Sequence, residues 1–385
     1  MPDNREKLYT RQFILMALSN FFVITSYGTF YMFPLFINSH GGSKTDIGII
    51  MGVAALSSVL FRPCVSRLID IVGRRKGYTI ACLGMAAFGL SYVLFDGDLR
   101  EFYIPLLFVR VFHGIVVALY FTSGYTYVAD IIPSSRLTEG VGMFGATGLT
   151  GMAIGPVIAE AVIKSAGFPT LFVTSALIAV TGTLTHLPLP ESYVASGREN
   201  GTQFFSLLSK KKTRTVAALS MLFGLSLAAS TNFVAPFAEE MNLPLISLYF
   251  ISYSASAVII RVFGGTLADR FGEIKVLPYS LVFTASGFFS LILLQGNCAL
   301  LMAGLLVGCG TGLLFPCLNG LAVRHEPIQD RSKATAIFTG AIDSGLFLGS
   351  ITLGVIGEWG GYKMLFLVAG LGILSGLCTR RNVKG

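Results

Sequence analysis

The chain has 385 residues, of which 53% are hydrophobic and 12% are charged, and its net charge at neutral pH is +8. Soluble domains carry about 25% charged residues, so this composition excludes a water-soluble fold of the same length. The basic excess could suggest nucleic-acid binding, but it gathers in short segments between apolar runs, which is typical of the inner loops of membrane proteins.

The apolar residues form runs of roughly 20, long enough to cross a hydrocarbon core of ~30 Å, and only helices satisfy every backbone polar group there. With both termini placed in the cytoplasm, the inner loops and helix ends carry 21 Lys and Arg and the outer ones carry 4. This bias predicts a multi-pass protein of the cytoplasmic (inner) membrane with both termini inside. We expect twelve transmembrane helices, centred near residues 24, 56, 86, 115, 150, 177, 225, 256, 285, 310, 345 and 371.

Tyrosine and asparagine side chains recur on helix faces of the first, fourth and seventh expected spans. Amphipathic aromatic and amide groups suit a cleft that binds a partly apolar organic molecule. Hydrogen bonding between neighbouring helices is the alternative interpretation. The candidate cavity residues are Asn20, Tyr27, Tyr31, Tyr120, Tyr127 and Asn232.

A charged segment after the second span is repeated later in the chain. FRPCVSRLIDIVGRRKGY (61–78) has the same layout as IRVFGGTLADRFGEIKVL (260–277), with Asp70 matching Asp269 and Gly73 matching Gly272 at an offset of 199. Each glycine permits a tight turn, and each aspartate can accept hydrogen bonds from the amides of the following helix. The alternative is that these segments only hold their loops inside, but retention of positive charge does not explain the repeated Asp–Gly spacing.

The fourth span carries the first of two buried charges. Arg110 lies within an apolar segment, and His113, Tyr120 and Tyr127 share its helical face. An intramembrane arginine is costly unless it is paired or hydrated, so we expect Arg110 to face a central cavity. His113 titrates near neutral pH when unperturbed and is a candidate proton carrier. The alternatives are an arginine that extends to the membrane surface and a histidine that is hydrogen-bonded in the core.

Asp343 is the other buried charge, in the eleventh span, with Thr339 and Ser350 on its helical face. Removal from water makes a carboxyl easier to protonate, so Asp343 is a candidate for loading and releasing a proton. A structural ion pair is the alternative.

One long polar stretch, residues 190–214, divides the chain into two copies of six spans. TFYMFP (29–34) parallels TNFVAP (231–236), which supports the repeat. Two copies of an even number of spans have the same orientation, so we expect two pseudo-symmetric six-helix bundles with a site between them. The expected domains are residues 1–187 and 214–385, joined by a basic cytoplasmic linker at residues 188–213.

At this point the sequence resembles a major facilitator superfamily transporter. SRLIDIVGRRK and GTLADRFGEIK resemble the superfamily's signature G-x-L-a-D-r-x-G-r-k, with Ser66 and Ile71 departing from it in the first copy and Glu273 in the second. RVFHG (110–114) resembles R-x-x-q-G, with histidine where glutamine is usual. GMFGATGLTGMAIGP (142–156) resembles G-x8-G-x3-G-P of the drug:proton antiporter branch, although Ala159 and Glu160 replace its terminal Gly-Gly.

The resemblance implies roles for these motifs. The doubled loop would be a conformational latch, the span 5 motif a flexible helix between the domains, and Arg110 a proton-coupling residue together with His113 and Asp343. Expected latch residues are Asp70, Gly73, Arg74, Arg75, Asp130, Asp269, Arg270 and Gly272, and those of the span 5 motif are Gly142, Gly151, Gly155 and Pro156.

These patterns predict a secondary transporter that exports a small organic molecule by alternating access in exchange for protons, as multidrug resistance proteins do. Proton-linked uptake of a sugar, organic acid or siderophore is the alternative, and a non-transporting membrane sensor is another. No P-loop or hydrolase motif is present, so we expect no enzyme activity. The six cysteines have no metal-ligand spacing, so we expect neither a metal nor a cofactor, and we expect a monomer without nucleic-acid partners.

Overall fold

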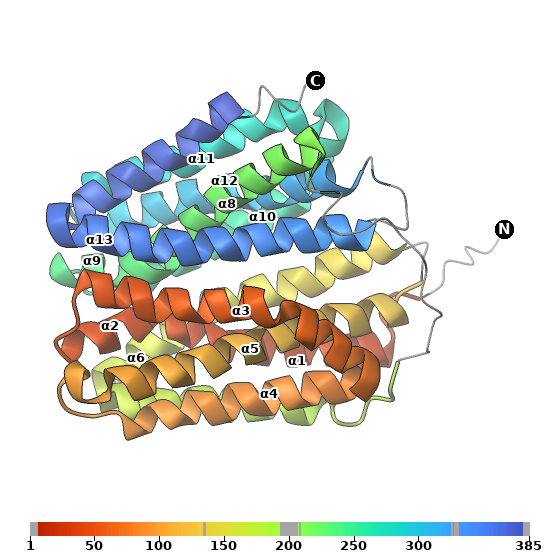
Figure 1. Ribbon diagram of the computed structural model, residues 1–385, viewed down its shortest axis with the longest axis horizontal. Helices are drawn as coiled ribbons and strands as arrows, with labels where there is room; N and C mark the ends of the chain where they lie inside the picture. Colours follow the sequence, from red (N-terminus) through yellow and green to blue (C-terminus); the bar gives the residue numbers. More distant parts are fainter. Residues whose placement is uncertain are drawn as a thin grey trace. The chain divides into compact units, whose positions relative to one another are not determined.

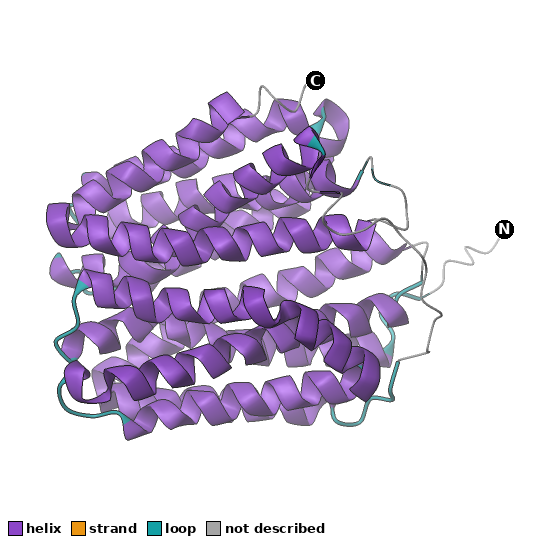
Figure 2. Ribbon diagram, in the orientation of Figure 1, coloured by secondary structure: helices purple, strands orange, loops and turns teal. Residues whose placement is uncertain are grey.

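All regular elements among the described residues are helices (Figure 2). The computed structural model describes residues 7–133, 136–192, 207, 209–324, 326 and 331–379, with the backbone alone at 138, 262–271, 331 and 332. In the first half of the chain the elements are α1 (Arg11–Thr29), η1 (Phe30–Met32), α2 (Phe33–Ser39), α3 (Lys44–Val72), α4 (Arg74–Ser91), η2 (Tyr92–Leu94), α5 (Leu99–Ile131) and α6 (Leu137–His186) (Figure 1). In the second half they are α8 (Lys211–Ala228), η4 (Ala229–Phe233), α9 (Val234–Glu240), α10 (Ser247–Phe271), α11 (Glu273–Ile292), α12 (Asn297–Val323) and α13 (Arg331–Thr379).

Two of these helices are long enough to cross a membrane twice. Both α6 and α13 are interrupted by a glycine in the left-handed region, Gly167 at φ +78° and Gly361 at φ +73°. A residue with a Cβ would be strained at either position. The two halves of each helix therefore count as separate spans, the fifth and sixth in α6 and the eleventh and twelfth in α13.

The first and seventh spans are interrupted at matching places. TFYMFP contains the 3-10 turn η1, and TNFVAP overlaps the π-helical turn η4. Each motif ends in a proline, Pro34 or Pro236, which has no amide hydrogen for the carbonyl four residues earlier. The repeated motif therefore explains why both spans change helix type near their C-terminal ends.

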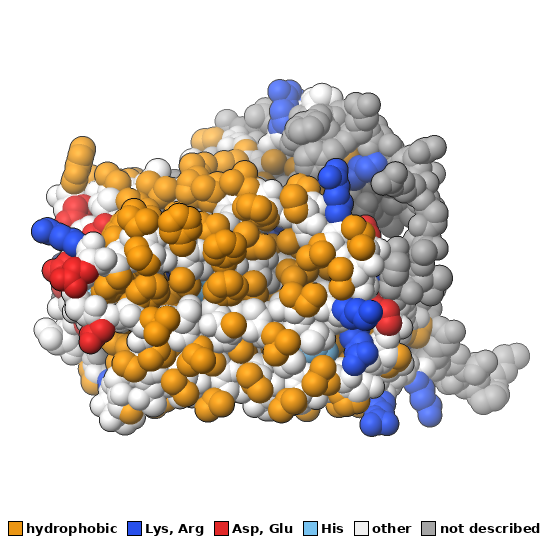
Figure 3. Space-filling model, turned by 60° about the horizontal axis from the view of Figure 1, so that its bottom comes forward, with side chains coloured by type: hydrophobic (Ala, Val, Ile, Leu, Met, Phe, Trp, Pro, Cys, Tyr) orange, Lys and Arg blue, Asp and Glu red, His pale blue; other side chains and the backbone are white. Residues whose placement is uncertain are grey.

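Apolar composition and length confirm an all-α membrane fold. Nine helices among the described residues are long and apolar enough to span a membrane, and they include both double-length helices. α10 adds a 25-residue helix, about 37 Å long at 1.5 Å per residue. On the face shown in Figure 3, apolar side chains form a broad band, and the charged side chains of both signs gather at its two ends, with most of the Lys and Arg at the right.

The helices form two compact units. The first contains residues 1–30 and 60–196, and the second contains 31–59 and 197–385. Within the first unit α1 packs along α6, and within the second α8 packs along α13. In each unit, therefore, the first span packs along the double-length helix. The expected domain boundaries, which were drawn from the sequence repeat, stay a prediction.

Candidate functional site

Arg74 joins the ends of two helices in the first copy of the doubled loop. Gly73, with φ +101°, separates α3 from α4, and Arg74 is the first residue of α4. The guanidinium Nη1 lies 3.0 Å from Asp70 Oδ1 at the end of α3, and Nε lies 3.5 Å from Asp130 Oδ2 at the end of α5. The structure thus brings together three of the expected latch residues, Asp70, Arg74 and Asp130, at neighbouring ends of spans 2, 3 and 4.

Arg75 contacts the segment that follows span 6. Its partner there, Glu191, is a residue that the sequence analysis did not single out. The backbone amide of Arg75 donates to Glu191 Oε1 at 3.0 Å, and its guanidinium donates to the carbonyl of Leu187. A Cβ at Gly73 would lie 2.5 Å from Glu191 Oε2, so the glycine makes room for this carboxylate. An acid at a helix N-terminus is stabilised by the free amides there, but Glu191 lies more than 100 residues from α4 in the sequence and gave no local signal.

The second copy of the loop contains an ion pair of opposite polarity. Gly272, with φ +84°, again precedes a helix, α11. Glu273 occupies the position of Arg74 at the offset of 199 and is 3.1 Å from Arg324 Nη2 at the end of α12. The side chains of Asp269 and Arg270 lie outside the described residues. Each copy therefore ties its third span to the end of its fourth, with the charges exchanged.

Arg110 and His113 are both buried in the first unit. Their exposed fractions are 5% and 1%. The Tyr92 hydroxyl, from the end of span 3, lies 3.0 Å from His113 Nδ1. Phe30 and Phe172 pack their rings around Tyr92. The structure thus places both residues inside the helix bundle, and the proton-coupling role of each stays a prediction.

Asp343 is half-buried on α13 in the second unit. The hydroxyl groups of its two expected polar neighbours bond to carbonyls of the same helix: Thr339 to Thr335 at 3.0 Å and Ser350 to Leu346 at 2.6 Å. Ser350 also accepts a hydrogen bond from Asn232 Nδ2 at 2.8 Å. The polar stripe on span 11 therefore meets span 7 within the second unit.

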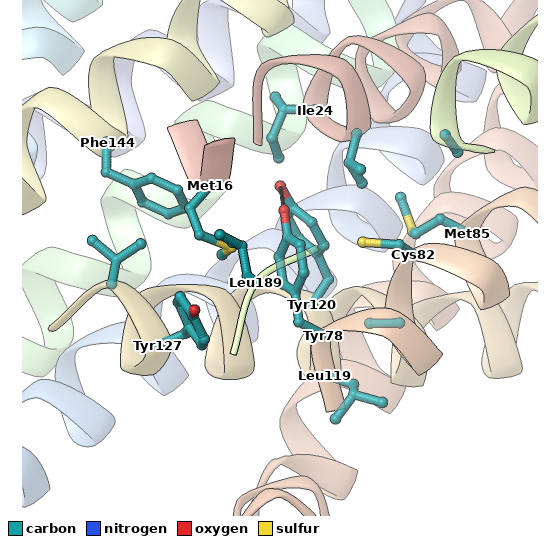
Figure 4. Packing of buried hydrophobic residues seen from close by; sticks show 14 of the residues in the cluster. Met16, Ile24, Tyr78, Cys82, Met85, Leu119, Tyr120, Tyr127, Phe144 and Leu189 are labelled. Atoms are coloured by element: carbon teal, nitrogen blue, oxygen red, sulfur yellow. Dashed lines mark hydrogen bonds between the residues drawn. The ribbon is translucent and has the colours of Figure 1, made fainter. Parts of the chain in front are cut away.

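A buried chain of hydroxyl groups connects four helices of the first unit. Tyr120 donates to Asn20 Oδ1 at 2.7 Å and accepts from Tyr78 at 3.4 Å, and Figure 4 shows the two tyrosine rings side by side with both hydroxyl groups at the same end. Ser19 lies 3.2 Å from Tyr78 and 3.3 Å from His186 Nδ1. Among the expected cavity residues, Asn20 and Tyr120 thus make the interhelical hydrogen bonds that were the alternative interpretation.

The other expected cavity residues differ in their surroundings. Tyr127 is buried, and its hydroxyl donates to the carbonyl of Pro190 at 2.9 Å. Tyr27 and Tyr31 are half-buried, Tyr27 with its ring edge-on to Phe121 in the first unit and Tyr31 beside Phe250 in the second. As residues that line a substrate cavity, all six stay predictions.

The span 5 glycines do not share one environment. A Cβ at Gly151 would lie 2.8 Å from the carbonyl oxygen of Phe21, and one at Gly155 would lie 2.6 Å from that of Thr25, so both glycines let α6 touch the backbone of α1. A Cβ at Gly142 would meet nothing within 4 Å. Pro156 is buried and follows directly. The close approach therefore lies in the second part of the motif.

Comparisons with known proteins agree with this architecture. A family model described as the Major Facilitator Superfamily matches residues 14–260 and 216–381. The multi-drug resistance efflux pump PmrA homolog of Lactococcus lactis is 25% identical over 94% of this chain and 92% of its own length. The staphylopine export protein of Staphylococcus aureus is 22% identical over 88% of this chain and 87% of its own.

Solved structures show the same fold at lower identity. The nucleoside transporter NupG, in a point-mutant form, aligns with a TM-score of 0.77 at 16% identity, over 96% of this chain and 99% of its own. A POT family transporter in complex with a thioalcohol-conjugated peptide aligns with a TM-score of 0.79 at 14% identity, over 96% and 94%. With a family model matched over nearly its whole length and the helical fold that these structures share, the chain belongs to the major facilitator superfamily.

Proposed function

We propose that this protein exports a small organic molecule across the cytoplasmic membrane in exchange for protons. The observation that carries the proposal is a guanidinium buried inside an apolar span. Arg110 lies eleven residues into α5 and is 5% exposed, about 16 Å from the outer end of the helix at 1.5 Å per residue. Charges at such depth are expensive and usually mark transport pathways.

Export is favoured over uptake by the relatives. The names of several relatives describe export or multidrug resistance, including multidrug resistance protein 1 of Bacillus subtilis, 24% identical over 74% of each chain. The span 5 motif points the same way by resemblance. Uptake is the second candidate, because the solved neighbours include a nucleoside transporter.

In the proposed cycle, Asp343 binds and releases the coupling proton, and Arg110 influences that exchange through its charge. The ion pairs Arg74–Asp130 and Glu273–Arg324 each join two helix ends of one unit, where a change of helix packing during the cycle would alter them. They are proposed to bias the two alternating states. No resident cofactor takes part, and the proton gradient supplies the energy.

Transport assays in everted vesicles test this proposal. Vesicles with a fluorescent pH reporter are screened with organic molecules, beginning with ethidium, under a proton gradient of either direction. Export predicts substrate accumulation in everted vesicles that collapses with the gradient, whereas accumulation only under the reversed gradient would indicate uptake. Binding without flux in either direction would indicate a sensor.

The variant Asp343→Asn tests the coupling step. Proton-driven flux should be lost, while substrate binding and counterflow exchange remain, because the amide cannot titrate. Glu358→Gln is the matched control, since Glu358 is exposed on the same helix. Full gradient-driven activity in Asp343→Asn would remove Asp343 from the mechanism.

A further inference from the structure

One segment of the first repeat, residues 31–59, packs as part of the second unit. It contains the end of span 1 and the start of span 2, and we call it the gate segment. The rest of α3, residues 60–72, belongs to the first unit, so one continuous helix is shared by both units. A movement of either unit must therefore bend α3 or detach the gate segment from the second unit.

Prolines mark both boundaries of the gate segment. A proline has no amide hydrogen for the carbonyl four residues earlier, so a helix bends most easily there. Pro63, inside α3, removes this donor from Val59, the last residue of the gate segment. Pro34 does the same for Phe30, the residue before the gate segment, where α1 changes to the 3-10 turn η1. Each end of the gate segment therefore coincides with a point at which the chain can bend.

Glycines bring the gate segment into backbone contact with α13. A Cβ at Gly48 would lie 2.4 Å from the carbonyl oxygen of Ser350, and one at Gly354 would lie 2.7 Å from that of Lys44. Neither position accepts a side chain unless α3 and α13 separate. The short helix α2 also packs against α9. Both helices of the gate segment thus contact the second half of the chain.

Lys44 is the charged contact of this arrangement. It is the first residue of α3, and its ammonium lies 3.5 Å from Glu240 Oε2 at the end of α9 and 4.6 Å from the centroid of the Tyr362 ring. The side chains of Lys44 and Glu240 are 25% and 54% exposed. Ion pairs and cation–π contacts that water reaches are weak, so both can break and form again. Lys44 therefore holds the gate segment reversibly.

We propose that residues 31–59 are a hinged gate that Lys44 holds against the second unit in this conformation, and that bends away at Phe30–Pro34 and Val59–Pro63 to open this end of the transport path. This inference rests on the proposed function, because alternating access requires such an opening. It differs from a movement of two rigid six-helix bundles, in which residues 31–59 would stay with the rest of their own repeat.

Labelling of a thiol beneath the gate segment measures its opening without a substrate. Ser350 is buried, and its Cβ lies 3.3 Å from the position of a Cβ at Gly52, so Ser350→Cys is the reporter. The six native cysteines are replaced by serine, and the full-length protein in membrane vesicles is treated with a membrane-impermeant maleimide from each face. Labelling should be about fivefold faster in Lys44→Gln, which loses both weak contacts, and faster also in Gly48→Ala. Lys363→Gln, at an exposed lysine of the second unit, is the matched control.

Pro63→Ala tests the hinge in α3. Alanine restores the amide hydrogen for Val59 and stiffens the helix, so this variant should unfold at the wild-type temperature or above it. Labelling of the Ser350→Cys thiol and proton-driven efflux of ethidium should both fall about tenfold, because α3 then resists bending. Pro278→Ala is the matched control in α11, a helix that lies entirely within the second unit, and it should leave both rates close to those of wild type.

Each result decides one part of the proposal. Equal labelling in Lys44→Gln and Lys363→Gln would show that Lys44 does not hold the gate segment. Wild-type labelling and flux in Pro63→Ala, or a lower unfolding temperature, would overturn the hinge. A wild-type protein that moves no ethidium would count against the proposed function with this probe, while the labelling rates would still decide whether the gate segment opens.

Discussion

Replacing Gly155 by alanine should destabilise the first unit, because the new methyl group would enter the backbone of α1. It would lie 2.6 Å from the carbonyl oxygen of Thr25 and 2.6 Å from the carbonyl carbon of Gly28. Ordinary van der Waals contact begins near 3.4 Å, so α1 and α6 must separate by about 0.8 Å. Backbone atoms cannot rotate away as a side chain can. Overpacking of this kind costs about 1–3 kcal/mol.

Gly142→Ala is the matched control on the same helix. A methyl group there meets nothing within 4 Å. Both substitutions gain the helix propensity of alanine over glycine, about 1 kcal/mol, so this gain cancels in their difference. The difference in unfolding free energy between Gly155→Ala and Gly142→Ala is therefore the cost of the clash, about 1–3 kcal/mol.

Thermal unfolding of the two variants in one detergent measures this difference. Gly142→Ala should unfold at or slightly above the wild-type temperature, and Gly155→Ala a few degrees below it. Equal unfolding temperatures, or a lower value for Gly142→Ala, would refute the assignment of the α1–α6 contact to the second part of the span 5 motif.

The remaining predictions concern contacts in both units. On α13, Gly345→Ala would press a Cβ against a carbonyl oxygen of α8, whereas a Cβ in Gly340→Ala meets nothing within 4 Å. Gly345→Ala should therefore unfold at a lower temperature than Gly340→Ala. Equal unfolding temperatures would show that α8 and α13 do not touch there. Reversing the charge of Glu273 or Arg324 singly should cost about 1–2 kcal/mol, and the double reversal should recover most of it. Additive losses would mean that the pair does not interact in solution. Glu191→Gln should lower the unfolding free energy by about 0.5–1 kcal/mol, because it removes the negative charge that lies beside the first turn of α4. Unchanged unfolding would mean that the carboxylate is not bound there.

Much of the fold could be predicted from the sequence, because a bilayer imposes simple rules. An apolar run of sufficient length must be a helix, and a proline or a glycine at a turn marks where a helix ends. The repeat at offset 199 placed Gly73 and Gly272 before α4 and α11, and both have positive φ. Arg74 and Asp130 were both expected among the latch residues, and the structure pairs them.

The contacts between side chains could not be predicted in the same way. Glu191, which follows span 6, binds the backbone amide of Arg75 in α4. Arg324 pairs with Glu273 with the charges exchanged relative to the first copy, and Tyr92 contacts His113. Sequence periodicity tells which face of a helix is apolar, but not which neighbour that face meets.

The sequence alone therefore determined the helices, their approximate ends and the doubled loop, because these depend on burial in lipid and on local backbone chemistry. The tertiary structure decided which polar groups are partners. A hydrogen bond depends on the approach of two atoms to about 3 Å, and only the packing of distant helices fixes that distance.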